Sequence, residues 1–311
     1  MLSIVIPCYN AATTIRRAVE SVMRQHDLDY EIIIVNDGST DDSSSIIAQL
    51  VSEDSRIKRV DKPNGGVSSA RNAGYNVARG EYIFFLDADD EIDDNFAKST
   101  IPLMDKHPDM VLFAFDVENA NGTWRTFTCT AHKDPISAYL LGMLRISICS
   151  LIFRKEIADR NAIQFDENTY YSEDREYVVR LLQCQQSIVF CNQVLFHYRY
   201  CASSAMHKPM YGEKYLTSLQ AMERVFAIVG NDTAQADAAL TQLNLTILLH
   251  IRQYLRSHDR DETLWPRLEA YGKYLLSPVK WHANTYSMYV KIMSGIYRIN
   301  KNLLYKTLKH F

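Results

Sequence analysis

The sequence lacks the features that mark several common classes of protein. None of its six cysteines forms a Cys-x-x-Cys pair and no zinc-ligand spacing appears, so we expect buried free thiols in a reducing setting. No stretch approaches the ~20 apolar residues of a membrane-spanning helix, because the longest candidate, residues 139–153, is interrupted by Arg145. The first residues include neither a basic leader nor a small-residue cleavage site. Together these absences predict a cytoplasmic protein.

Charge is present but unevenly distributed. The net charge is −3, from 34 Lys and Arg against 37 Asp and Glu, which does not favour a nucleic-acid binder. No Asp or Glu follows Glu269, and the cations beyond it carry +7, which leaves −10 for residues 1–269. These cations are Lys273, Lys280, Lys291, Arg298, Lys301, Lys306 and Lys309. The chain therefore combines an acidic body with a basic tail.

The 311 residues, of which 47% are hydrophobic, are enough for one large or two moderate domains. Residues 1–90 alternate short apolar runs, such as 31–35, with segments of helical periodicity, such as 67–78. This order predicts a parallel, doubly wound sheet with right-handed crossovers. Residues 95–207 mix helical patterns with extended segments, among them 188–191 and 195–200, and almost everything from Met210 onward has helical periodicity.

An apolar run, Phe84 to Leu86, stops at the acidic segment Asp87-Ala88-Asp89-Asp90. Such a run is typical of a buried parallel strand, and open α/β sheets bind ligands outside the carboxyl ends of their strands. Asp87 and Asp89 are two residues apart, so in an extended chain both point to the same side. Two convergent carboxylates suit Mg²⁺ or Mn²⁺, which in turn suits a diphosphate. The alternative is a solvated acidic loop, since Asp is a common turn residue.

Five motifs stand in order along the chain. They are Ile4-Val5-Ile6-Pro7-Cys8-Tyr9-Asn10, Val35-Asn36-Asp37-Gly38-Ser39-Thr40-Asp41, Asn64-Gly65-Gly66-Val67-Ser68-Ser69-Ala70-Arg71-Asn72-Ala73-Gly74, Gly80-Glu81-Tyr82-Ile83-Phe84-Phe85-Leu86-Asp87-Ala88-Asp89-Asp90 and Ser172-Glu173-Asp174. Together they closely resemble family 2 glycosyltransferases, inverting enzymes with the GT-A fold that mostly use UDP-sugars. The resemblance covers about residues 1–205, and residues 151–157 also look like the acceptor half of bacterial members.

The resemblance implies an α/β fold of the GT-A type, in which a Rossmann-like, mostly parallel sheet is flanked by helices and followed by a helical C-terminal region. Residues 1–208 would form the glycosyltransferase domain, with a nucleotide-binding half at 1–94 and an acceptor half at 95–208. Residues 209–311 would form the helical region that carries the basic tail.

The resemblance also implies which residues bind the donor. Asp37 would accept a hydrogen bond from the uracil N–H, a role that suits an ionised carboxylate because it can only accept. Pro7 and Tyr9 would line the nucleobase pocket. Arg71 would help to hold the nucleotide and could bridge the diphosphate or one of the acids. The alternatives are an ordinary turn residue for Asp37 and a surface position for Arg71.

For the metal, Asp89 is the first choice as a direct ligand, while Asp87 would contact the ribose or the metal. Asp90 would support these groups or belong to a turn. The cofactor would be Mn²⁺ or Mg²⁺, which would neutralise the diphosphate as it leaves. His197 or His207 could also reach the metal, although a lone histidine is more often structural.

By the same resemblance, Asp174 is the general base. Inverting transfer needs a carboxylate that removes the proton of the acceptor hydroxyl on the face opposite the leaving UDP. Glu173 would be an acceptor-binding or hydrogen-bonding neighbour, and Arg199 would fold over the diphosphate. The alternative for Asp174 is an ordinary acid in the first turn of a helix, where the helix dipole favours negative charge.

The sequence departs from the family pattern in three places. Asn36 stands where many members carry Asp, and Ser172 stands where many carry Gly, but neither change removes a group that the mechanism requires. The Gln-x-x-Arg-Trp motif of processive, membrane-spanning members is absent, since Gln253 to Ser257 ends in Ser. Its absence favours single-sugar addition.

The tail joins its cations to aromatic residues. These are Tyr271, Tyr274, Trp281, Tyr286, Tyr289, Tyr297, Tyr305 and Phe311. Lysines and aromatics on amphipathic helices suit the surface of an anionic membrane, so we expect peripheral contact with the inner face of the cytoplasmic membrane. The alternatives are a basic helix pair packed on the catalytic domain and a dimer contact.

The sequence is thus interpreted as that of an inverting, non-processive glycosyltransferase of the hexosyltransferase type. It would move one sugar from a UDP-sugar to a glycan or lipid-linked acceptor in the synthesis of bacterial surface polysaccharide or lipopolysaccharide. Two rivals are a non-catalytic sugar-nucleotide-binding protein on the same fold and a sugar nucleotidyltransferase. The second rival would need a glycine-rich, basic phosphate loop after the first strand, which this chain lacks.

Overall fold

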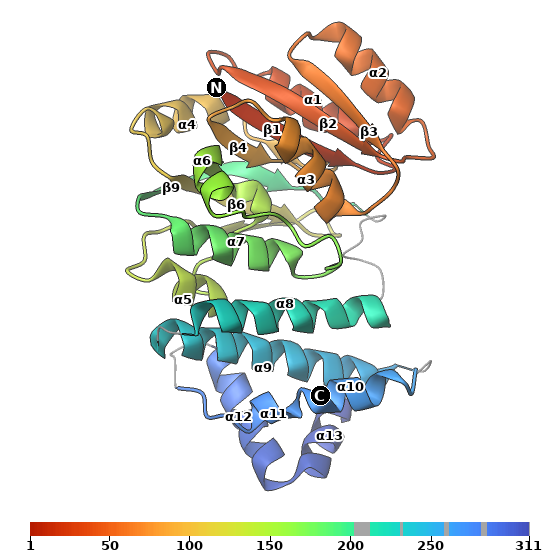
Figure 1. Ribbon diagram of the computed structural model, residues 1–311, viewed down its shortest axis with the longest axis vertical. Helices are drawn as coiled ribbons and strands as arrows, with labels where there is room; N and C mark the ends of the chain where they lie inside the picture. The colour runs from red at the N-terminus through yellow and green to blue at the C-terminus, as the bar shows by residue number, and fades with distance from the viewer. Residues whose placement is uncertain (202–211, 231–232, 258–260, 281–284, 311) are drawn as a thin grey trace. The chain divides into compact units, whose positions relative to one another are not determined.

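The computed structural model describes residues 1–201, 212–230, 233–257, 261–280 and 285–310 (Figure 1). The chain divides into two compact units. The sheet unit comprises Met1–Ala131, Arg145–Glu167 and Leu181–Lys208. The helical unit comprises His132–Leu144, Asn168–Arg180 and Pro209–Phe311. The predicted division between residues 208 and 209 stays a prediction, and two earlier segments, 132–144 and 168–180, pack with the helical unit.

The sheet unit contains a nine-stranded sheet in the order β3-β2-β1-β4-β8-β6-β9-β5, with β7 paired to β6. The strands are β1 (Leu2–Cys8), β2 (Tyr30–Asp37), β3 (Ile57–Lys62), β4 (Tyr82–Phe85), β5 (Glu91–Ile92), β6 (Met110–Glu118), β7 (Trp124–Phe127), β8 (Leu151–Arg154) and β9 (Ile188–Tyr198). The first four strands are parallel to one another. The predicted α/β class with a mostly parallel first half is therefore confirmed.

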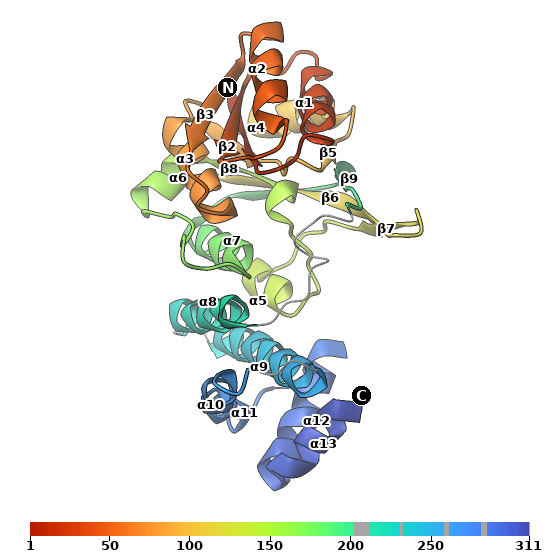
Figure 2. The same cartoon turned by 90° about the vertical axis from the view of Figure 1, so that its right-hand side faces the viewer.

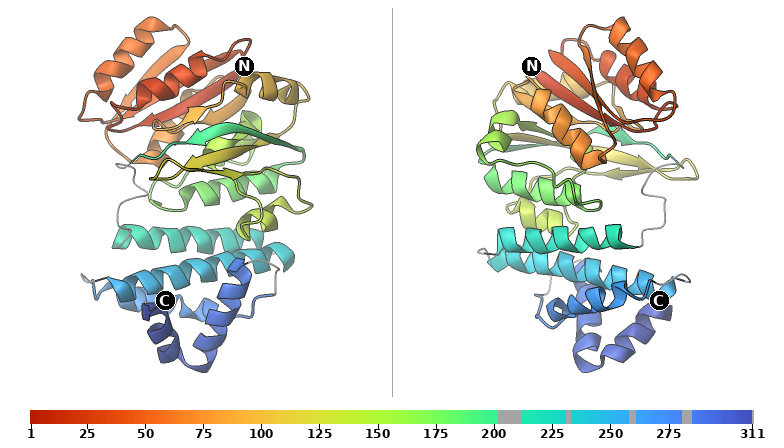
Figure 3. Two further views of the ribbon diagram at one scale, coloured as in Figure 1. Left: turned by 180° about the vertical axis from the view of Figure 1, so that it is seen from behind. Right: turned by 45° about the vertical axis from the view of Figure 1, so that its right-hand side comes forward.

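Helices cover both faces of this sheet. They are α1 (Ile15–Met23), α2 (Ser43–Glu53), α3 (Val67–Val77), α4 (Phe96–Met104), the 3₁₀ turn η1 (Ile148–Ser150) and α6 (Lys155–Arg160). Figures 1 and 3 show α3 on one face of β1 and β2, and α1 and α2 on the other. Successive strands are therefore added in one direction across the sheet from β1 to β3, and β4 is then added on the other side of β1. The point between β1 and β4 where this order reverses is where open α/β sheets form a ligand crevice.

Close packing fixes α3 on its face of the sheet. Gly74 faces Val5 of β1 and Val35 of β2, and an added Cβ would lie only 2.3 Å from a methyl carbon of Val5. A side chain at this position would therefore force the helix away from the sheet. Because α3 carries Arg71, this contact also determines where that arginine lies.

The second half of the sheet differs from the sequence expectation in detail. β8 runs antiparallel to both β4 and β6, whereas β9 is parallel to β6. The two extended segments expected at 188–191 and 195–200 form one strand, Ile188–Tyr198, whose pairing with β6 shifts register at Asn192 and Gln193 and again at Leu195. The shift explains the break in the pattern, because a bulge interrupts the alternation of side chains between the two faces.

The helical unit is built around α9. Its helices are α5 (Pro135–Leu140), α8 (Glu213–Val229), α9 (Thr233–Arg256), α10 (Leu264–Ala270), α11 (Gly272–Leu275), α12 (Thr285–Ile299) and α13 (Lys301–His310), and it shares α7 (Glu173–Cys184) with the sheet unit. α8, α12 and α13 all pack on α9, and α12 and α13 lie side by side (Figure 2). Within the described ranges, no helix has the length and apolar character that crossing a membrane requires.

Candidate active site

The acidic segment lies directly after β4, as the sequence predicts. The amide of Leu86 still donates to the carbonyl of Val5 at 3.0 Å, and the amide of Asp90 then turns back to the carbonyl of Asp87 at 3.1 Å. The sheet hydrogen bonding thus ends at Leu86, and a tight turn presents three acids beside the end of β1. This position is the carboxyl edge of the parallel strands, where ligands of open α/β sheets bind.

Arg71 is buried, which excludes the surface position considered for it. Its Nη2 lies 2.8 Å from Oδ1 of Asp87, and its guanidinium lies 5.3 Å from the centre of the Phe165 ring. A buried guanidinium needs a charge partner, and here the partner is the first acid of the loop. α3 thereby fixes the position of Asp87, whereas the predicted role of Arg71 in donor binding stays a prediction.

The surroundings of Asp89 and Asp90 disfavour the negative charge of their carboxylates. Asp90 is buried, and none of the described residues donates a hydrogen bond to its Oδ2. Burial and the neighbouring charges of Asp87 and Asp89 raise the pKa of Asp90 well above its usual range. Burial, with the charge of Asp87, also raises the pKa of Asp89 to about 6. An acidic loop in open solvent would show no such shifts.

These observations fit a divalent cation. Oxygen atoms of Asp87 and Asp90 and Sγ of Cys149 lie within 4.8 Å of one another, so the three could surround one ion. Burial and the charges of Asp87 and Asp90 raise the pKa of the Cys149 thiol well above its usual range, and hard cations prefer oxygen. The two carboxylates are therefore the stronger ligands of the group. Asp89, the first choice from the sequence, is not a member of it, and its ligand role stays a prediction.

Asp37 lies at the end of β2, where it organises the neighbouring loop. Its buried carboxylate accepts hydrogen bonds from Lys62 Nζ at 2.5 Å, from the Gly65 amide at 3.0 Å and from the Gly66 amide at 2.8 Å. Asn64 also donates through its side chain to the carbonyl of Asp37 at 3.0 Å. Asp37 is thus more than a turn residue. A carboxylate has about four acceptor sites, so capacity for one further donor remains.

The loops that follow β1 and β2 are tied together beside Asp37. Pro7 is buried in β1, whereas Tyr9, just beyond the strand, is exposed. Asn10 accepts a hydrogen bond from the Thr40 amide at 2.8 Å through its side chain, and its own amide donates to Ser39 Oγ at 3.1 Å. Because β1 and β2 are paired in register as far as Cys8, Tyr9 is held at the same edge of the sheet as Asp37.

Arg199 contacts the acidic loop through two different groups. Its amide donates to Oδ1 of Asp90 at 2.9 Å, while its Nε donates to Glu91 at 2.6 Å and its guanidinium lies 4.8 Å from the centre of the Trp124 ring. Glu91 also pairs with Arg17 at 3.3 Å, and Arg17 donates to the carbonyl of Asp89 at 2.6 Å. Glu91 therefore links two arginines that hold the loop. Sequence reasoning missed Glu91 and Arg17, because no motif marks them.

His197 is held between two carboxylates. Its Nδ1 lies 2.7 Å from Asp116 and its Nε2 lies 3.3 Å from Asp93. With both ring nitrogens in contact with carboxylates, the structural interpretation of this histidine is the better one. His207, the other histidine considered as a ligand, lies outside the described residues.

Glu173 and Asp174 open α7, in the part of this helix that belongs to the helical unit. Ser172 precedes them and has φ +66°, in the left-handed region that glycine favours. This backbone conformation accounts for the Gly that many family members carry at this position. Both acids are half-buried. Glu176, one turn on, is buried and pairs with Arg224 through two contacts of 2.9 and 2.8 Å. Glu176 is thus a structural acid, whereas Asp174 accepts only the neighbouring Arg175 amide, at 2.7 Å, among the described contacts.

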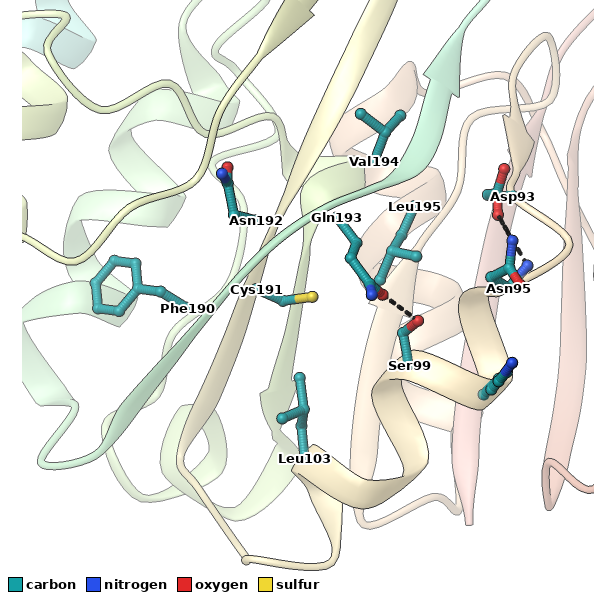
Figure 4. A pocket seen from close by; sticks show the side chains of 11 residues that line it. Asp93, Asn95, Ser99, Leu103, Phe190, Cys191, Asn192, Gln193, Val194 and Leu195 are labelled. Carbon is teal, nitrogen blue, oxygen red and sulfur yellow. Dashed lines mark hydrogen bonds between the residues drawn. The ribbon is translucent and has the colours of Figure 1, made fainter.

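A hollow of about 790 Å³ in the sheet unit lies elsewhere, between α4 and β9 (Figure 4). Gln193 on β9 reaches across to accept a hydrogen bond from Ser99 on α4. None of the site residues predicted from the sequence lines this hollow. It is therefore separate from the acidic loop.

Comparison with known proteins agrees with the geometry. The sequence model described as Glycosyl transferase family 2 matches residues 3–158. The chain is 26% identical to glycosyltransferase GlyG of Streptococcus pneumoniae over 289 residues, 85% of this chain and 91% of GlyG. It is 30% identical over 207 residues to the minor teichoic acid biosynthesis protein GgaB of Bacillus subtilis, 63% of this chain and 23% of GgaB. It also shares the fold of S. aureus TarS in complex with UDP-GlcNAc, with a TM-score of 0.73 at 19% identity, over 99% of this chain and 90% of that chain.

Proposed function

This chain belongs to glycosyl transferase family 2, and we propose that it is an inverting, non-processive hexosyltransferase that moves one sugar from a UDP-sugar to a glycan or lipid-linked acceptor. The observation that carries the proposal is the acidic loop at the carboxyl edge of the sheet, where buried Arg71 pairs with Asp87 and where Asp37 ends β2. Two findings on similar proteins support it. TarS, which has the same fold, binds UDP-GlcNAc and UDP. GgaB acts in teichoic acid biosynthesis, which favours a bacterial surface polysaccharide or lipopolysaccharide as the product.

Asp87, Asp89 and Asp90 would hold Mn²⁺ or Mg²⁺. Oδ2 of Asp90 accepts no hydrogen bond from the described residues, and the pKa values of Asp89 and Asp90 are raised although the nearby charge of Arg17 lowers them in part. Both observations support this assignment, because burial and repulsion between the acids outweigh that single positive charge. When bound, the cation supplies positive charge to the diphosphate as that group leaves. Arg71 keeps the Asp87 carboxylate in place for this purpose.

The uridine would be recognised at the ends of β1 and β2. Asp37 is fixed by three donors and keeps acceptor capacity for the uracil N–H. Pro7 and Tyr9 would form the wall of the base pocket, with the exposed ring of Tyr9 available for stacking. A guanine presents donors and acceptors in different places, so this arrangement would discriminate against guanosine diphosphate.

Asp174 would take the proton from the acceptor hydroxyl as that oxygen attacks the anomeric carbon from the face opposite UDP. The new glycosidic bond forms as the bond to the UDP oxygen breaks, so the anomeric configuration inverts. Glu173 would orient the acceptor. The difference between Asp174 and the ion-paired Glu176 supports this choice, because a base must be able to accept a proton during each turnover.

We include peripheral contact with the inner face of the cytoplasmic membrane in this proposal, through the basic tail. The net charge of that tail favours anionic lipid, and a lipid-linked acceptor would lie at the same surface.

A donor screen tests the proposed function. The purified full chain would be incubated with a panel of nucleotide sugars and Mn²⁺, and slow hydrolysis would be followed by release of the nucleotide. We expect hydrolysis of at least one UDP-sugar, loss of that activity in excess chelator, and recovery when Mn²⁺ or Mg²⁺ is restored. Hydrolysis that prefers a GDP-sugar, or that continues in excess chelator, would contradict the proposed donor or the proposed metal respectively.

A further inference from the structure

Helix α12 is apolar on two opposite faces. Its buried face consists of Ser287, Val290, Met293 and Ser294. Met288, Ile292 and Ile299 are 43%, 51% and 86% exposed, and at about 100° per residue they fall within about 40° of one another, directly opposite the buried face. A surface helix of a globular protein normally carries polar residues there. This second apolar face therefore needs an explanation.

The exposed apolar residues continue into α13. Leu303, in the first turn of α13, is 50% exposed, while Leu304 and Leu308 form the buried face of that helix. Lys306 and Lys309 are exposed on α13, about 60° and about 120° around the helix from Leu303, and Lys291 is exposed next to Ile292 on α12. We call Met288, Ile292, Ile299 and Leu303, with these three lysines, the tail surface.

The tyrosines of the tail are not part of this surface. All six are half-buried and pack inside the helical unit. The ring of Tyr286 fills the space that a Cβ on Gly142 would occupy, the ring of Tyr305 packs edge-on against Trp265 at 5.1 Å, and Tyr274 donates to Glu223 at 2.7 Å. Trp281 and Phe311 lie outside the described residues. The described aromatic residues of the tail, which the sequence led us to expect at a membrane surface, therefore contribute to internal packing. The exposed apolar residues of α12 and α13 are instead aliphatic.

We infer that the tail surface docks on an anionic phospholipid bilayer, with its aliphatic side chains in the interface and its lysines on the headgroups. The inference rests on the membrane contact of the proposed function and names the residues that make it. Its basis is charge complementarity, since the tail surface carries three exposed lysines and residues 270–311 hold no acid. Aliphatic residues flanked by lysines on one helical face are typical of helices that lie in a membrane interface.

A second copy of this chain is the rival occupant. A two-fold symmetric dimer through the tail surface would bring the same lysines of both copies together, because such an interface uses one patch twice. Like charges at an interface oppose association. Anionic lipid instead satisfies both the apolar and the basic parts of the surface.

Vesicle flotation with the full chain tests the inference. Vesicles of phosphatidylglycerol mixed with phosphatidylcholine should bind the protein, pure phosphatidylcholine should bind it much less, and added salt should release it. Ile292→Ser with Ile299→Ser should weaken binding at least about tenfold. Lys306→Gln with Lys309→Gln should weaken it about fivefold per lysine. These positions are exposed, so the substitutions leave the contacts of α12 and α13 with α9 intact, which a truncation would not.

Matched controls lie outside the tail surface. Leu249→Ser replaces another exposed aliphatic residue of the helical unit, and Lys98→Gln removes an exposed cation of the sheet unit. Both controls should bind vesicles as the unaltered chain does. Unaltered binding by the Ile292/Ile299 variant, or equal binding to both kinds of vesicle, would overturn the inference.

Two further measurements separate this inference from its rivals. Sedimentation velocity without lipid would reveal a dimer that Ile292→Ser and Ile299→Ser dissociate, and that result would assign the tail surface to a second copy. Calorimetry with UDP should give the same affinity for all tail variants. A chain that binds vesicles but no nucleotide would refute the proposed transfer while leaving the docking surface in place, and the converse would refute the docking surface alone.

Discussion

Replacing Asp89 by asparagine should stabilise the metal-free protein. The carboxyl of Asp89 has an ordinary pKa of 3.8, and burial together with the charge of Asp87 raises it to about 6 in the folded chain. The difference corresponds to about 3 kcal/mol of unfolding free energy at pH 7. The asparagine side chain has the same size without the charge, so Asp89→Asn should recover most of this amount. Proteins often lose stability at functional sites in this way.

The pH dependence has a definite direction. Because the folded pKa of Asp89 lies above the unfolded one, the folded protein binds this proton more tightly. The corresponding stability is fully present below about pH 4 and is lost as the pH rises through about 6. The variant and the unaltered chain should therefore be equally stable near pH 4, and the advantage of the variant should reach its full size above about pH 6.

Hydrogen exchange in increasing urea, with chelator present, can measure this effect in the sheet unit alone, if it is followed on the amides of β1 and β4. Asp94→Asn is the matched control, because Asp94 is an acid of the same region whose side chain is 75% exposed beside Arg24. We expect the control to change stability by no more than about 0.5 kcal/mol at any pH.

Two results would refute the reasoning. Asp89→Asn could be no more stable than the unaltered chain at pH 7.5, in which case the charge of Asp89 would not destabilise the folded protein. Its advantage could also be the same at pH 4 and pH 7.5, which would indicate a packing effect. Transfer by this variant should fall by at least ~10²-fold, as expected for the loss of a group that stabilises charge in the transition state.

Four further predictions follow from individual contacts. Calorimetry should detect binding of uridine diphosphate but not of guanosine diphosphate, and Asp37→Ala should weaken the first; equal affinities for both nucleotides would remove Asp37 from base recognition. Asp174→Asn should keep donor affinity and lower the transfer rate by ~10²–10⁴-fold, with loss of the pH dependence set by the base; unchanged transfer would redirect the search to Glu173. Removing the divalent cation should abolish transfer, and Mn²⁺ or Mg²⁺ should restore it. Burial lowers the pKa of His250 to about 4. Stability that is present above about pH 6.5 should therefore be lost as the pH falls to about 4, by up to about 3 kcal/mol. His250→Gln should flatten this part of the dependence of stability on pH, measured by hydrogen exchange of the α9 amides.

The first half of the fold could be predicted from the sequence because its signals are local. β1, β2 and β4 contain apolar runs that end in turn motifs, and the helix predicted at 67–78 is observed at Val67–Val77. A strand buried on both faces and an amphipathic helix have different periods, so their alternation already implies a parallel sheet. The position of Asp87 at the end of β4 follows from the same reasoning.

Other features depend on contacts between distant segments, which no local pattern records. Cys149 lies on a 3₁₀ turn some sixty residues after the acidic loop in sequence, yet its sulfur lies within 4.8 Å of the oxygens of Asp87 and Asp90. Glu91 is a single acid after three others, and only the fold shows that Arg17 and Arg199 both pair with it. The division of the tail into buried tyrosines and exposed aliphatic residues likewise depends on which face of each helix meets α9.

The arrangement of arginines around the acidic loop is the strongest structural argument for a binding site there. Arg17 reaches the carbonyl of Asp89, and Arg199 reaches Asp90 only through its amide, while both guanidinium groups pair with Glu91. The cations thus fix the course of the loop, but in the described part of the chain no guanidinium forms an ion pair with the carboxylate of Asp89 or Asp90, whose pKa values stay raised despite the nearby charge of Arg17. A loop selected only for stability would have neutralised these buried charges. Their retention, at a cost in stability, is what a preorganised site for a cation requires.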